Sequence, residues 1–108
     1  MKIVSFTYEL VPEAKGFCVN CLDWDCVFTE GDTYEQCKKN AEEVTGMFLK
    51  MLTKGELNKV QYPKFKKHKT SPYHFQLYFN LDTHKPVNIN KMGNRFTAIN
   101  KENELVLV

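Results

Sequence analysis

The sequence lacks any apolar run approaching the roughly 18 residues that a membrane-spanning helix needs. It also lacks an apolar block at its N-terminus, where polar and apolar residues alternate, so no secretory signal peptide is indicated. From these absences we expect a cytoplasmic protein that does not enter a membrane. The chain has no repeat or low-complexity segment, and its formal net charge of +2 gives no global basic field for nucleic acid.

The composition is that of a folded chain. Hydrophobic residues make up 43% of the 108 residues, and eight Phe and five Tyr exclude a disordered chain. This length suits one domain with a single modest core. We predict one domain over residues 1–108, with a core in 1–81 and a C-terminal β extension in 82–108.

Three strands are predicted before the first helix. Residues 2–10 alternate so that one side of the segment is apolar, which is typical of a half-buried strand. Two further apolar segments, 17–23 and 25–30, are separated by almost nothing around Trp24. They predict a tight hairpin that forms a three-stranded antiparallel meander with the first strand.

A long helix is predicted over residues 33–52. Asp32 or Thr33 can cap its first turn, and Glu35 and Gln36 stand three residues after these two candidates. That spacing is the capping box in either register. Apolar residues then recur at intervals of three and four, which gives the helix one side to bury.

The remainder of the chain reads as β structure after a basic linker. Residues 73–81 predict a fourth strand, and 86–89 a short extended piece. Residues 95–99 and 104–108 flank the polar segment 100–103 as a C-terminal hairpin. The predicted class is therefore α+β, an antiparallel sheet of order β-β-β-α-β with one long helix packed on one face.

Four cysteines crowd into the first third of the chain, and two of them form a C-x-x-C pair. Cys18 and Cys21 lie within a predicted strand, where residues three apart point to opposite faces. Small buried thiols are therefore favoured over a metal or redox site, and no metal or cofactor is predicted. The four residues are Cys18, Cys21, Cys26 and Cys37.

The first half of the chain resembles the HicB-type antitoxins, over about residues 2–55. The matching positions are Gly16-Phe17-Cys18-Val19, Asp23, Cys26, Gly31-Asp32-Thr33, Glu35, Asn40, Ala41 and Glu43. The resemblance implies a partial ribonuclease-H-like sheet with one helix across it, often dimeric. It also implies a binding role without catalysis, in which the protein covers a small basic toxin ribonuclease and silences it.

The segment after Leu81 is too short and too strand-like for the DNA-binding module that many HicB-type proteins carry. We therefore expect no DNA recognition by this chain alone. Because an open sheet leaves exposed edges, a homodimer is expected.

Acidic residues and one tryptophan around the second and third strands are the candidate partner surface. They are Asp23, Trp24, Asp25, Glu30 and Asp32. Negative charge complements a basic ribonuclease. An exposed tip tryptophan would anchor the contact; alternatively, its ring folds back over the edge of the sheet.

The alternative function is direct RNA binding by a basic cluster, Lys64, Lys66, Lys67 and Lys69, interleaved with Phe65 and flanked by Tyr62 and Tyr73. Lysines beside aromatic rings suit single-stranded RNA, although an ordinary solvated linker whose aromatic residues pack inward has the same composition.

A third hypothesis, a metal-dependent nuclease, needs carboxylates that converge on ions about 4 Å apart. A strand of about five residues separates Asp23 and Asp25 from Glu30 and Asp32 by roughly 15 Å, which argues against it. The histidines, His68, His74 and His84, are expected at the surface, and no catalytic residue is predicted.

Overall fold

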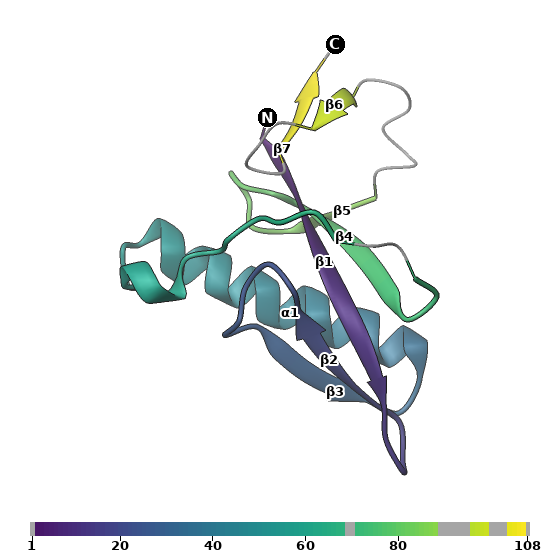
Figure 1. The fold of residues 1–108 in the computed structure, drawn as a ribbon. Helices are drawn as coiled ribbons and strands as arrows, with labels where there is room; N and C mark the ends of the chain where they lie inside the picture. The colour runs from purple at the N-terminus through teal and green to yellow at the C-terminus, as the bar shows by residue number, and fades with distance from the viewer. Residues whose placement is uncertain (1, 69–70, 89–95, 100–103, 108) are drawn as a thin grey trace.

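A computed structural model describes residues 2–68, 71–88, 96–99 and 104–107 (Figure 1). Its elements in chain order are β1 (Ile3–Pro12), β2 (Phe17–Cys21), β3 (Phe28–Gly31), α1 (Tyr34–Thr53), the short 3-10 helix η1 (Lys59–Gln61), β4 (His74–Asn80), β5 (Pro86–Val87), β6 (Phe96–Ile99) and β7 (Glu104–Leu107).

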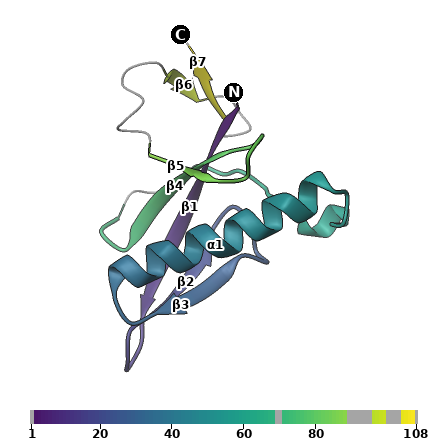
Figure 2. The ribbon, with the colours of Figure 1, turned by 180° about the vertical axis from the view of Figure 1, so that it is seen from behind.

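Five strands form a curled antiparallel sheet in the order β3-β2-β1-β4-β5. The helix α1 lies across one face of this sheet (Figures 1 and 2). The predicted α+β class, with an antiparallel sheet and one long helix on one face, is thereby confirmed. β7 pairs with β6 and with the start of β1. The turn of the expected C-terminal hairpin, residues 100–103, and residue 89 of the expected short strand lie outside the described residues.

The hairpin between β2 and β3 is wider than its sequence predicted. The two strands were expected to run to residue 23 and from residue 25, but they end at Cys21 and begin at Phe28. The connection from residue 22 to residue 27 forms the tip instead. Its ends are held together because the Cys21 amide donates to the Val27 carbonyl at 2.9 Å.

The start of α1 follows the capping chemistry in its sequence. The Thr33 hydroxyl accepts a hydrogen bond from the Gln36 amide at 3.2 Å, so Thr33 is the N-cap. In return, the Gln36 side chain accepts from the Asp32 amide at 2.9 Å. Two backbone donors at the helix start are therefore satisfied by side chains.

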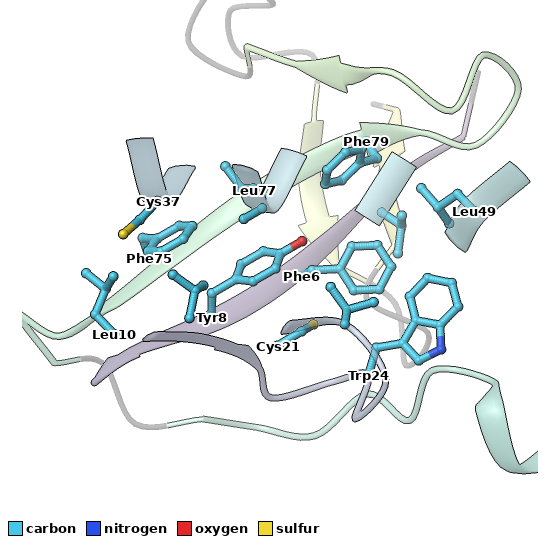
Figure 3. Packing of buried hydrophobic residues seen from close by; sticks show 14 of the residues in the cluster. Phe6, Tyr8, Leu10, Cys21, Trp24, Cys37, Leu49, Phe75, Leu77 and Phe79 are labelled. Carbon is cyan, nitrogen blue, oxygen red and sulfur yellow. The ribbon is translucent and has the colours of Figure 1, made fainter. Parts of the chain in front are cut away.

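The hydrophobic core fills the space between α1 and the sheet (Figure 3). Alternate residues of β1 face the helix, and the buried side of α1 includes Cys37, Ala41, Thr45 and Leu49. One polar pair is enclosed with them, since the Tyr8 and Thr45 hydroxyls lie 2.5 Å apart. The pairing satisfies both hydroxyls, which would be costly to bury alone.

The connection from α1 to β4 determines the direction of β4. A strand that follows a crossover helix in the same sheet commonly runs parallel to the strand before it. Here the connection, described over residues 54–68 and 71–73, brings the chain back to the far end of β1, where the Leu10 amide donates to the Tyr73 carbonyl at 2.7 Å. β4 therefore runs antiparallel to β1. In Figure 1 the middle of this connection passes in front of β1, whereas α1 lies behind the sheet; Figure 2 gives the reverse view.

Candidate functional site

Asp23, at the tip between β2 and β3, is buried, with a residue exposure of 2%. Its Oδ2 accepts from the Thr7 amide on β1 at 2.8 Å, and its Oδ1 lies 2.7 Å from His68 Nε2. Its carbonyl oxygen accepts from the Lys64 amide at 2.7 Å. A single carboxylate residue thus joins β1, the hairpin tip and the connection that follows α1. The expectation that Asp23 presents its charge to a partner is wrong, because these groups enclose it.

Trp24 is also buried, with an exposure of 1%. Its ring stacks on Phe6 at a centroid distance of 5.7 Å and meets Phe48 of α1 edge-on at 5.8 Å (Figure 3). The indole N–H donates to the Gln61 carbonyl. Pairing of β2 with β1 ends at Tyr8, and the tryptophan packs on the part of β1 beyond it. The exposed-anchor alternative is therefore wrong, and the ring folds back against the sheet.

The five residues expected to form one partner surface are divided by the fold. Asp23 and Trp24 are internal, whereas Asp25 is exposed at the hairpin tip. Glu30 and Asp32 are exposed at the opposite end of β3, where the chain enters α1. Only these last two residues share a neighbourhood. We call the exposed acidic residues at this end, Glu30, Asp32 and Glu35, the acidic junction.

The acidic junction rests on a rigid backbone. The Asn40 side chain donates to the Glu30 carbonyl at 2.7 Å, which ties the edge strand β3 to α1. Gly16 has a φ of +84°, and a Cβ there would lie 2.4 Å from the Gly31 carbonyl oxygen. The β1–β2 turn and the end of β3 therefore approach as closely as glycine permits. An open hollow of about 360 Å³ lies here, lined by Lys15, Phe17, Glu30, Gly31, Asp32, Gln36 and Asn40.

The basic segment is held against the hairpin tip. We call residues 59–68 the strap. Phe65 turns inward, with its ring 5.5 Å from that of Phe6, and His68 bonds Asp23. Of the lysines predicted to bind RNA, Lys64, Lys66 and Lys67 are exposed, and Lys69 lies outside the described residues.

Sequence reasoning missed the anchoring role of His68. His68 was expected at the surface, but its side chain is only 16% exposed and pairs with a carboxylate 45 residues earlier. Phe65 packs against the core, as the solvated-linker alternative expected of the aromatic residues. The alternation of Lys64, Phe65 and Lys66 in the sequence is the local signal for this inward packing. His74 and His84 are half-buried, and His84 Nε2 lies 2.7 Å from the Thr53 hydroxyl oxygen.

The cysteines are free thiols, of which Cys21 and Cys37 are buried. Burial is the main cause that raises the pKa of Cys21 to about 12, which keeps it protonated. Cys18 instead donates its S–H to Glu13 Oε1 at 2.8 Å, and this bond raises the pKa of Cys18. Within the described part of the chain, no three His, Cys, Asp or Glu side chains gather as metal ligands would. No helix there is long and apolar enough to span a bilayer.

Comparison with family models, curated proteins and solved structures gave no match to this chain. The resemblance to HicB-type antitoxins therefore depends on the quoted residues themselves. The two exposed charged surfaces, the acidic junction and the strap, are the candidate binding sites.

Proposed function

We propose that this protein is a binding protein of the antitoxin type, which neutralises a small basic ribonuclease by covering it, without catalysis of its own. The observation that carries the proposal is the acidic junction, three exposed acidic residues on a backbone fixed by side-chain hydrogen bonds. A fixed surface loses little conformational entropy on association. Negative charge there would attract a basic ribonuclease and exclude its RNA substrate.

An apolar contact is available next to the junction. Phe28 is 67% exposed on the edge strand β3, two residues before Glu30, so both side chains are on the same side of the sheet. Exposed aromatic residues often supply the central contact of an interface. We assign Phe28 as the apolar anchor and the acidic junction as the surrounding polar contact.

The finer fold assignment is part of the same proposal. We assign β1 to β3 and α1 to the partial ribonuclease-H-like unit that the resemblance implies. We also propose a homodimer in the cytoplasm, because the open sheet leaves β3 as an edge strand whose outer backbone groups can pair with a second copy. Analytical ultracentrifugation of the purified chain measures this directly; a monomer at all concentrations would contradict it.

The test is co-expression with the small basic protein encoded beside this gene. A junction variant, Glu30→Gln/Asp32→Asn/Glu35→Gln, removes three exposed charges from the proposed surface. A control variant, Glu43→Gln/Glu56→Gln/Asp82→Asn, removes three exposed charges elsewhere. The proposal expects wild type and control to protect cells from the ribonuclease, and the junction variant to lose protection. Equal protection by both variants, or a host with no such neighbouring gene, would overturn it.

A further inference from the structure

We propose that the strap, residues 59–68, is a binding surface for single-stranded RNA, independent of the acidic junction. Over residues 61–66 of the strap, partly buried residues alternate with exposed ones. The Gln61 backbone carbonyl accepts from the Trp24 N–H, and the Phe65 ring packs against Phe6. Tyr62, which follows Gln61, and Lys64, which precedes Phe65, are exposed.

The anchoring holds the strap in one shape. The Asp23 carbonyl accepts from the Lys64 amide at 2.7 Å, and the Asp23 carboxylate contacts both the Lys66 amide at 3.5 Å and His68 Nε2 at 2.7 Å. These amide contacts at alternate residues, Lys64 and Lys66, hold the part of the strap that follows the 3-10 helix η1 in an extended form. A lysine on such a segment therefore has a defined position, unlike a lysine on a flexible linker.

The displayed side chains have the chemistry of a single-strand site. Lys64 and Lys66 lie on the same side of the extended segment, about 7 Å apart along the chain, so they can contact successive phosphates. Lys67 is exposed beside them. Tyr62, which is 41% exposed, lines a small hollow together with Lys64 and Lys66. Val60, which is 85% exposed, lines the same hollow. An exposed ring beside phosphate-binding lysines is the arrangement on which an unpaired base stacks.

Two neighbouring carboxylates bear on the charge of this surface. Asp23 also lines the hollow, but it is buried and its carboxylate is held by the Thr7 amide and His68. Asp25 lines the same hollow as Lys64 and Lys66 and is exposed. The exposed balance remains positive, three lysines against one aspartate, which favours a polyanion. The exposed aromatic ring favours nucleic acid over an acidic protein.

Binding of a labelled oligouridylate, followed by fluorescence anisotropy, tests the proposal. Three phosphate contacts predict that log K falls with log salt at a slope of about −2, which is about a 20-fold loss between 50 and 200 mM salt. A strap variant, Lys64→Glu/Lys66→Glu/Lys67→Glu, should weaken binding by more than about tenfold and flatten this slope. Tyr62→Ala should weaken binding about tenfold with the slope unchanged.

The matched control places the same charge change on α1 and its C-cap, Lys39→Glu/Lys50→Glu/Lys54→Glu, where all three lysines are exposed. It should bind RNA as wild type does. Equal loss in the strap and control variants, or no binding by a folded wild type, would overturn the proposal. Displacement of the oligonucleotide by polyglutamate as effectively as by unlabelled RNA would also overturn it, in favour of an acidic protein partner. Far-UV circular dichroism establishes that each variant is folded.

Discussion

His68 Nε2, at the end of the strap, lies 2.7 Å from Oδ1 of Asp23, 45 residues earlier in the sequence. Asp23 is at the hairpin tip, and His68 is the last residue of the strap. Since Asp23 also accepts from the Thr7 amide, the contact ties the strap to the central strand β1. The hairpin tip therefore connects β1 to the strap. The proposed binding charges lie in two places, on the strap at the hairpin tip and in the acidic junction at the opposite end of β3.

Replacing Asp23 should be far more costly than replacing Asp25. Asp23→Ala leaves the buried Thr7 amide and the His68 ring without their acceptor, which predicts a loss of about 3 kcal/mol in the free energy of unfolding. Asp25→Ala removes an exposed carboxylate and should change it by less than about 0.5 kcal/mol. Urea unfolding of both variants measures the difference. Similar values for the two would contradict the burial of Asp23.

The single tryptophan reports on the same region. Because Trp24 is 1% exposed, its fluorescence in the native protein should be blue-shifted and poorly quenched by acrylamide. Unfolding in urea should shift the emission to the red and expose the ring to quencher. Native emission already resembling that of free tryptophan would mean that the indole lies at the surface.

Two glycines with positive φ should respond differently to alanine. At Gly55, with φ +71°, a Cβ meets nothing within 4 Å. Gly55→Ala should therefore lower the free energy of unfolding only by the cost of holding alanine at a positive φ, about 1 kcal/mol. At Gly16 the added Cβ also collides with the Gly31 carbonyl oxygen. Gly16→Ala should therefore be clearly more destabilising in urea unfolding. If the two variants lose equal stability, the close approach of the two turns is absent.

Stability should fall in alkali because Cys21 is held as a thiol. Its pKa is about 12 in the folded chain against 9.0 for an ordinary cysteine, so above pH 9 only the unfolded state releases this proton readily. The contribution is fully present below pH 9 and is lost as pH rises towards 12, by at most about 1.4 kcal/mol per pH unit. Urea unfolding between pH 8 and 10 should show this slope in wild type. Cys21→Ala should reduce the slope, and an unchanged slope would contradict the assignment.

Local signals in the sequence predicted the local parts of the fold. The Thr33 cap, the span of α1 and the positions of β1 and β4 follow from capping residues and alternation, which act over a few positions. The burial of Asp23 and Trp24 depends on His68 and Gln61, 45 and 37 residues away, and no local pattern encodes such contacts. The length of the intervening strand predicted that Asp25 lies far from Glu30 and Asp32, but not that Asp23 and Trp24 are lost from the candidate partner surface by burial.

The most direct test of two independent binding surfaces measures both activities on the same pair of variants. The junction variant and the strap variant would each be titrated against the proposed partner, a small basic ribonuclease whose RNA cleavage is followed, and against labelled oligouridylate. The account predicts that the junction variant loses inhibition and keeps oligouridylate binding, while the strap variant keeps inhibition and loses oligouridylate binding. Loss of both activities in either folded variant, or the reverse assignment, would contradict it.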